Sequence, residues 1–441
     1  MCSAEPSLEA QQPAPRIAGT RPTRVRHVVL WLTVAAYMIT YMDRVVIGSA
    51  MPSIQKEFGF GFVTAGWILS SFRWGYALFQ IPGGWLGDRI GPRRALTIIV
   101  TWWSIFTSLT SLCWSAGSMA VTRFLFGVGE AGAFPIATRS LSRWMLPSER
   151  GYAQGLTHAG SRLGAAVTPP LVVALIAYNG WRAPFLLFGT FGIGWAVVWF
   201  LYYRDVPSEH RSVNESELAL IHSSVGKLPR TTKSVPWRSI LACRTLWILS
   251  AMYFCYGYCL AVYLDWFPSY LKVHRGFNLK EMGMYAALPL FAGTLGDIAG
   301  GWLSDLWLKR TGNIRQARRV FGTAGFLLAA AAIIPATLTQ GALTSVWFSC
   351  LAVFGLELTV GVSWAVPLDI GGDYAGSVSA VMNTWGNIGG AISPAVLGYV
   401  VRGFGWNQPF LVASVMCCIA AALYAKIDAS QRIEYAESYD H

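Results

Sequence analysis

Several long apolar stretches of the sequence contain charged side chains whose types and spacing could do chemistry. The first stretch holds Asp43 beside Arg44, and the fourth holds Arg123 and Glu130. On a helix, the seven-residue spacing of Arg123 and Glu130 places both on one face, roughly 10 Å apart along the axis. A carboxyl group in apolar surroundings can exchange protons. An arginine stays positively charged, and its forked guanidinium group suits carboxylate or phosphate. The pattern indicates proton exchange beside an anion-binding arginine.

Glu130 is the first candidate for a proton-carrying residue. The glycines around it, Gly127, Gly129 and Gly132, let a neighbouring helix or a ligand approach closely. The alternative is that Glu130 is a permanent structural partner of an arginine. Asp43 is the second candidate for proton coupling.

Arg44 and Arg123 are the expected fixed counter-charges for an anion, because arginine does not lose its proton. For Arg44, the alternative is a structural ion pair with an acid on another helix. Asp43 and Arg44 are adjacent, so they differ by about 100° around a helix and face different surroundings. One of them can then serve a binding site while the other braces the structure.

Ionisable residues within the apolar stretches comprise five acids and five bases, a balance that permits mutual neutralisation. Each costs about 2.5–3.5 kcal/mol on insertion scales, so each is expected to pair or to line water. Arg73 and Arg162 are expected to brace the scaffold. The roles of Asp265, Asp297 and Glu357 stay open. The full set is Asp43, Arg44, Arg73, Arg123, Glu130, Arg139, Arg162, Asp265, Asp297 and Glu357.

Three uncharged polar residues lie near the middle of apolar stretches: Tyr76, Asn383 and Asn387. Polar groups at that depth need hydrogen-bond partners. A hydroxyl-rich substrate could supply them, which makes these residues candidates for substrate binding.

A basic loop follows the second apolar stretch and begins with Asp88. An aspartate at a helix end that faces arginines can form charge-assisted bonds, and these can break and re-form as parts of a molecule tilt. This predicts a gate rather than a substrate site, and Asp305 is expected to repeat the arrangement. The arginines of the first loop are Arg89, Arg93 and Arg94, and Asp305 precedes Lys309 and Arg310.

These residues must be held by membrane-spanning helices. The chain is 54% hydrophobic and only 13% charged, whereas about 25% charged residues is ordinary for a soluble domain. Runs this long and continuously apolar exclude a β-barrel and predict helices of about 20 residues each. The twelve predicted spans are 28–50, 62–86, 95–115, 118–142, 151–178, 183–203, 245–270, 281–305, 318–339, 342–368, 374–401 and 407–427.

Two sets of residues recur along the chain. The run 83–88, Gly-Gly-Trp-Leu-Gly-Asp, returns at 300–305 as Gly-Gly-Trp-Leu-Ser-Asp. In the second set, Pro169, Trp181, Pro184 and Phe185 return as Pro394, Trp406, Pro409 and Phe410. Such repeats predict duplicated halves that face each other across a central cavity.

The predicted organisation therefore has two six-helix bundles, at 28–203 and 245–427. A cytoplasmic linker at 204–244 joins them, and Asn214 with Glu217 three residues later predicts a short surface helix within it. Residues 1–27 are expected to be a disordered cytoplasmic head and 428–441 a cytoplasmic tail. The fold class is an all-α membrane protein of twelve transmembrane helices.

The net charge of +12 does not indicate nucleic-acid binding, because Lys and Arg gather in the loops on the side of both termini. This bias predicts that both termini are cytoplasmic in a multi-pass protein of the cell membrane. No metal-spaced His and Cys cluster, nucleophile elbow or phosphate loop is found. We therefore expect no enzymatic activity, no metal and no cofactor.

The motifs resemble the anion:cation symporter branch of the major facilitator superfamily over about residues 28–427. The loop Gly84-Trp-Leu-Gly-Asp88-Arg89-Ile-Gly91-Pro-Arg93-Arg94 is similar to the signature of that superfamily. Marks of the branch are Tyr41-Met-Asp43-Arg44, Gln80-Ile-Pro82, Gly129-Glu130-Ala-Gly-Ala-Phe134-Pro135, Trp266-Phe-Pro268 and Met382-Asn383-Thr384. Bacterial carriers of galactonate, glucarate and hexuronates, and animal sialic-acid and phosphate carriers, look similar.

The resemblance implies that Asp43 and Glu130 take protons. It also implies that Arg44, Arg123, Tyr76 and Asn383 shape the anion site. Asp265 and Glu357 stand where many relatives are uncharged. These two acids leave open the charge and identity of the substrate.

The resulting hypothesis is a monomeric, proton-coupled symporter of a small organic anion, with a sugar acid such as an aldonate, uronate or aldarate as substrate. Alternating access would carry the anion as the halves rock, and protonation of Glu130 would free Arg123 to hold it. A sodium-coupled or uncoupled organic-anion carrier is the alternative. A membrane sensor that binds a ligand without transporting it is a further one.

Overall fold

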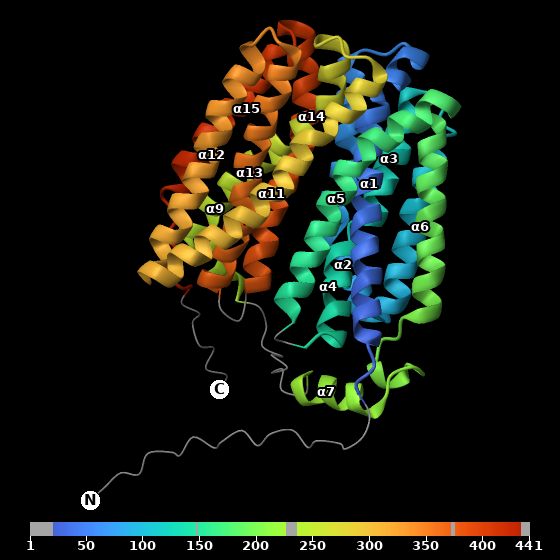
Figure 1. The fold of residues 1–441 in the computed structure, drawn as a ribbon, viewed down its shortest axis with the longest axis vertical. Coiled ribbons are helices and arrows are strands. Elements are labelled where there is room, and N and C mark those ends of the chain that lie inside the picture. The colour runs from blue at the N-terminus through green and yellow to red at the C-terminus, as the bar shows by residue number, and fades with distance from the viewer. Residues whose placement is uncertain (1–20, 147–148, 226–235, 372–374, 434–441) are drawn as a thin grey trace, which may run out of the picture.

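The chain folds into two bundles of long helices that lie side by side (Figure 1). The computed structural model describes residues 21–146, 149–225, 236–371 and 375–433, and within these ranges it holds helices and no strand. The all-helical class predicted from the sequence is confirmed.

The first bundle consists of α1 to α6, and the second of α9 to α15. The first contains α1 (Val25–Phe58), α2 (Phe62–Thr110), α3 (Ala116–Glu130), α4 (Ala133–Trp144), α5 (Arg150–Asn179) and α6 (Arg182–Tyr202). The second contains α9 (Arg244–Ala261), η2 (Val262–Trp266), α10 (Phe267–Ser269), η3 (Tyr270–His274), α11 (Leu279–Thr311), α12 (Ile314–Leu338), α13 (Ala342–Gly371), α14 (Ala375–Phe404) and α15 (Asn407–Tyr424). The link between the bundles contains η1 (Pro207–Glu209), α7 (Glu215–Val225) and α8 (Trp237–Ala242).

Every predicted span coincides with helix to within a few residues, although helices and spans do not match one to one. The predicted spans 62–86 and 95–115 share the bent helix α2, which turns at Gly91, where φ is +79°. The predicted span 118–142 is divided into α3 and α4. In the described residues, seven helices are long and apolar enough by themselves to cross a membrane. Twelve crossings stay a prediction.

The repeated residues occupy equivalent places in the two bundles. Gly180 and Gly405 both have positive φ, at +73° and +84°. Trp181 and Trp406 follow them as the N-cap residues of α6 and α15. The same turn therefore closes the fifth predicted span of each half, as a duplicated chain requires.

The two bundles touch at the end of the molecule far from α7 and diverge towards the end near α7 (Figure 1). Helix α2 packs on α14, and α5 packs on α11. The contact of α2 with α14 is tight, because a Cβ atom at Gly66 would collide with the carbonyl oxygen of Pro394. The hydroxyl of Ser70 donates a hydrogen bond to the carbonyl of Ala391 in the same seam.

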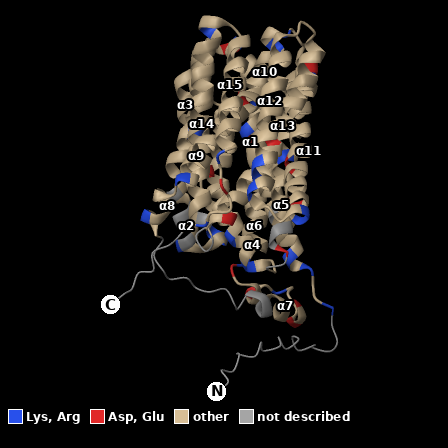
Figure 2. Cartoon of the chain, turned by 90° about the vertical axis from the view of Figure 1, so that its left-hand side faces the viewer, with Lys and Arg blue, Asp and Glu red and all other residues tan. Residues whose placement is uncertain are grey.

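Charged residues lie mostly at the two ends of the helices, and a smaller group lies at mid-height (Figure 2). That central group is positioned by a close seam between α2 and α3. A Cβ atom at Gly127 would collide with the carbonyl oxygen of Phe72. The prediction that the glycines near Glu130 admit a neighbouring helix is thereby confirmed.

The linker helix α7 is fastened to the start of α1. Asn214 caps α7, since its Oδ1 accepts a hydrogen bond from the Glu217 N–H at 2.9 Å. The buried carboxylate of Glu217 does not return to Asn214 but accepts hydrogen bonds from the backbone N–H groups of Val25 and Arg26, at 3.3 and 3.2 Å. A carboxylate at a helix N-terminus stabilises the exposed N–H groups there. Residues 1–20 and 434–441, in the predicted head and tail, lie outside the described residues.

We expect Glu217→Ala to lower the free energy of unfolding by about 1–3 kcal/mol, since it leaves buried N–H donors without an acceptor. Glu215→Ala is the matched control, because Glu215 is exposed in the first turn of the same helix. Thermal unfolding of the purified protein in detergent measures both. Equal melting temperatures for the two variants would show that the Glu217 contact contributes nothing.

Candidate functional site

The centre of the first bundle holds a buried ion pair between α1 and α3. Arg44 Nε binds Glu130 Oε1, and the side chain of Glu130 is 0% exposed whereas that of Arg44 is 16% exposed. The other oxygen of Glu130, Oε2, and the Nη2 atom of Arg44 have no hydrogen-bond partner among the described residues. The basic member of the pair is therefore the one that a ligand could reach.

Four aromatic rings surround the guanidinium of Arg44. Its central carbon lies 5.0 Å from the ring centre of Tyr41 and 4.8 Å from that of Tyr76. Phe72 and Phe134 stand at 5.4 and 5.3 Å. Aromatic faces attract a cation without neutralising it. They pack around the arginine without neutralising its charge, which is paired with Glu130.

Asp43 is completely buried behind this pair. Both of its carboxylate oxygens lack a hydrogen-bond partner of normal geometry within the described ranges. A charged carboxylate is costly to bury in this way, whereas a neutral one is not. Asp43 thus has the surroundings of a residue that can carry a proton.

Arg123 does not pair with Glu130. It is 1% exposed, its guanidinium lies 4.3 Å from the ring centre of Phe126, and its Nη1 donates to the carbonyl oxygen of Asp43 at 3.5 Å. The direct exchange of Arg123 between Glu130 and an anion, expected from the sequence, does not match this geometry. The reason is tertiary: the fold places the side chain of Arg44, on α1, against Glu130 at the end of α3.

The two asparagines lie on α14, in the opposite bundle. Asn387 donates from its side-chain amide to the carbonyl oxygen of Asn383, one turn earlier, at 3.0 Å. Both residues are half-buried. In the described part of the chain they make no hydrogen bond to the Arg44 cluster, so their part in substrate binding stays a prediction.

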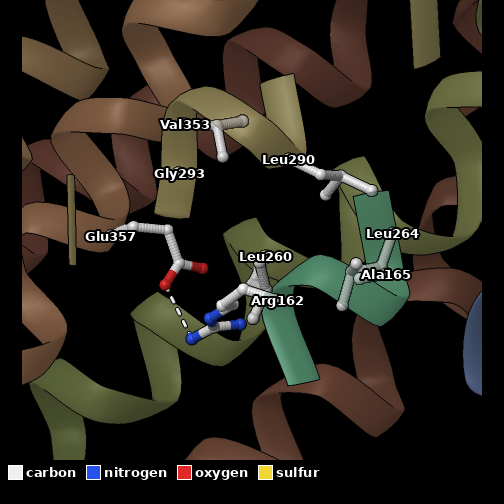
Figure 3. A pocket seen from close by; sticks show the side chains of 8 residues that line it. All are labelled: Arg162, Ala165, Leu260, Leu264, Leu290, Gly293, Val353 and Glu357. Carbon is white, nitrogen blue, oxygen red and sulfur yellow. Dashed lines mark ion pairs between the residues drawn. The ribbon is translucent and has the colours of Figure 1, made fainter. Parts of the chain in front are cut away.

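Two further buried ion pairs join the bundles to each other. Arg73 on α2 pairs with Asp265 of η2 at 2.9 Å. Arg162 on α5 pairs with Glu357 on α13 at 2.7 Å, and the Tyr256 hydroxyl donates to Glu357 at 3.1 Å. Figure 3 shows Arg162 and Glu357 pointing towards each other at one side of a small cavity whose other walls are apolar. The sequence indicated charged residues here but did not reveal that each pair spans the two halves.

The predicted gate of the first bundle is organised by Asp205, a residue that the sequence analysis did not single out. Asp205 accepts from the backbone N–H of Arg93 at 3.1 Å and from the side chain of Arg143 at 3.2 Å. Arg93 also donates to the carbonyl oxygen of Phe200. The position of Asp205 directly after a predicted span was the signal available. The side chain of Asp88 lies outside the described residues, so its partners and those of Arg89 stay a prediction.

The second bundle carries a comparable network around Arg318 of α12. Arg318 binds Asp305 at 3.1 Å and Asp369 at 2.9 Å. Among the described residues, Asp305 thus pairs with Arg318 rather than with Lys309 or Arg310, the partners expected from the sequence. The second network joins α11, α12 and α13 within one bundle. Arg94, of the predicted first gate, is exposed.

No group of three or more His, Cys, Asp or Glu side chains that could hold a metal ion occurs in the described ranges. The candidate site is thus an ionic cluster in a helical frame. Its parts are a reachable arginine, a buried acid beside it and a second buried acid behind.

The sequence profile of the Major Facilitator Superfamily matches residues 33–394. The chain belongs to the Major Facilitator Superfamily. It is a multi-pass membrane protein of this superfamily.

Its relatives in the superfamily are transporters. The probable sulfoacetate transporter SauU of Cupriavidus necator is 41% identical over 403 residues, which cover 90% of this chain and 93% of the relative. The probable galactarate/D-glucarate transporter GudP of Bacillus subtilis is 33% identical, with 91% of each chain covered. A crystal structure of a bacterial homologue of the human lysosomal transporter Spinster, inward-facing and unoccupied, superimposes with a TM-score of 0.76 at 22% identity and covers 93% of this chain and 98% of its own. That likeness supports the fold alone.

Proposed function

We propose that this protein is a secondary transporter that couples the movement of a small organic anion to protons. The observation that carries the proposal is the buried Arg44–Glu130 pair, whose basic member is reachable and whose acidic member is not. The relatives described above, with names that specify sulfoacetate, galactarate and glucarate, support an organic acid as substrate.

In the proposed mechanism, a proton on Glu130 removes the charge that holds Arg44, and the arginine then binds the acid group of the substrate. Tyr76 borders the same guanidinium. Asp43 carries or gates a second proton, and Arg123 acts as a buried positive charge beside it. Loss of the proton lets Glu130 reclaim Arg44, which expels the anion.

Alternating access follows if the bundles rock about this cluster. The described bundles diverge at the end near α7, and that end is cytoplasmic in our proposal. The gates on the cytoplasmic side would then be formed by the charged residues predicted for that role: Asp88, Arg89, Arg93, Arg94 and Asp305. We further propose that the protein acts as a monomer in the cell membrane, on a sugar acid or another small organic acid.

Uptake into proteoliposomes tests the proposal and its rivals. With an acidic outside, we expect accumulation of radiolabelled substrate that collapses on addition of a protonophore and that persists in sodium-free buffer. Loss of uptake in sodium-free buffer, with resistance to the protonophore, would favour sodium coupling. Binding without any uptake would favour a sensor. A panel of sulfoacetate, glucarate, glucuronate and galactonate supplies the substrates.

A further inference from the structure

We infer that the substrate carries two acid groups, and that Arg162 binds the second while Arg44 binds the first. This inference rests on the proposed function and narrows its substrate class to small dianions. The acid groups can be carboxylates or sulfonates, since both present oxygens to a guanidinium fork.

The two arginines share one aromatic side chain. The guanidinium carbon of Arg44 lies 5.0 Å from the ring centre of Tyr41, and that of Arg162 lies 5.8 Å from the same point. The two positive groups can be no farther apart than the sum of these distances. The two guanidinium carbons therefore lie within 10.8 Å of each other, and in this inference one small molecule with an acid group at each end contacts both.

The two arginines also share a pattern of exposure. The side chain of Arg162 is 12% exposed and that of its partner Glu357 is 2% exposed, as Arg44 is more exposed than Glu130. In both pairs an incoming anion meets the arginine before it meets the acid. The small cavity beside Arg162 has otherwise apolar walls, so the guanidinium and Glu357 supply its charges (Figure 3).

Arg73 and Arg123 each show only one of these two features. The guanidinium of Arg123 shares the ring of Phe72 with Arg44, at 5.4 Å from each. Arg123 is 1% exposed beneath Phe126. Arg73 lies against the backbone of α14, where its guanidinium would touch any Cβ atom placed on Gly390. Its side chain is 15% exposed and that of Asp265 is 10% exposed, but among the described residues its guanidinium shares no aromatic ring with Arg44.

Binding of the second acid group at Arg162 would affect the contact between the two bundles. Tyr41, Arg44 and Arg162 all belong to the first bundle, so their spacing persists when that bundle moves as a body. Glu357 belongs to the second bundle. An acid group that takes Arg162 from Glu357 removes an ion pair between the bundles, and a dianion thereby loosens their contact, whereas a monoanion held by Arg44 alone does not.

The inference is tested with ligand pairs that differ in one charge and little in size: malonate against malonamate, and sulfoacetate against sulfoacetamide. Binding to the purified protein is measured by calorimetry at one pH. We expect the wild type to bind each dianion roughly 10- to 100-fold more tightly than its amide, the range for a charge-assisted hydrogen bond.

Two double variants, each of which removes one buried ion pair without leaving a lone charge, locate the effect. Arg162→Gln with Glu357→Gln should bring the dianion and the amide to within about threefold of each other and retain binding of the amide. Arg73→Gln with Asp265→Asn is the matched control and should keep the full preference. Arg162→Lys, which keeps the charge without the fork, gives an intermediate preference and replaces the first double variant if that one does not fold.

The outcomes separate this inference from the proposed function. Equal affinity of the wild type for a dianion and its amide overturns the dianion site, as does an equal loss of preference in both double variants. Proton-driven accumulation of galactonate without binding of any dianion also overturns it and leaves the proposed function standing. If no organic anion is bound or accumulated, the proposed function itself fails.

Discussion

Glu130→Gln is expected to abolish proton-driven accumulation of substrate while leaving exchange of substrate across the membrane within several-fold of the wild type. Glutamine keeps the size of the side chain and an oxygen that can accept from Arg44 Nε, but it neither takes nor releases a proton. Arg44 then remains available to the anion in every state. Transport continues, but the proton gradient no longer drives it.

Two measurements in proteoliposomes check this result. Net uptake against a concentration gradient, with an acidic outside, should fall to the level of empty liposomes. Counterflow, in which internal unlabelled substrate exchanges for external label, should persist. Glu57→Gln is the matched control, because Glu57 lies in the last turn of α1, the helix that carries Arg44. Glu57 is 42% exposed and pairs with Arg182 at the surface. Undiminished accumulation by Glu130→Gln would show that Glu130 is not the coupling residue.

Much of the architecture could be predicted because it depends on local sequence. The length of each apolar stretch locates a helix, and the repeated Gly-Gly-Trp-Leu motif reveals the duplication. The predicted helix boundaries were wrong where the backbone bends or breaks at a position that hydropathy does not indicate. Two spans share α2, which bends at Gly91, and α3 ends at Glu130 before a turn and the start of α4.

The members of the candidate site were predicted better than their pairings. Asp43, Arg44, Arg123 and Glu130 were identified because charge is costly in an apolar helix. Their partners depend on which helices touch, and one sequence does not show this. Residue spacing suggested that Arg123 and Glu130 act together, whereas in the fold Glu130 pairs with Arg44 of α1.

Aromatic residues were the weakest part of the prediction for the same reason. Tyr41 and Phe134 stood within the motifs, but aromatic residues are common in any membrane helix. Only the fold shows that their rings, with those of Phe72 and Tyr76, enclose one guanidinium. Arg162 was expected to brace the scaffold, and its pair with Glu357 does join the two bundles.

Arg44→Gln is expected to weaken binding of the transported anion by at least about 100-fold. Replacement removes a charge-assisted, two-pronged contact and also leaves Glu130 charged and without its ion-pair partner at the place where the anion must sit. Both effects act against an anion. Arg182→Gln should leave binding unchanged, because Arg182 forms an exposed pair with Glu57, and such pairs contribute about 0–1 kcal/mol.

The double variant Arg44→Gln with Glu130→Gln distinguishes these two effects. If repulsion by Glu130 accounts for the loss, neutralising it restores affinity. If the guanidinium itself binds the anion, as we propose, the double variant stays at least tenfold weaker than Glu130→Gln alone, although both lack the acid. Calorimetric titration of the three variants gives the comparison. Wild-type affinity in the double variant would mean that Arg44 serves only to neutralise Glu130 and that the anion binds elsewhere.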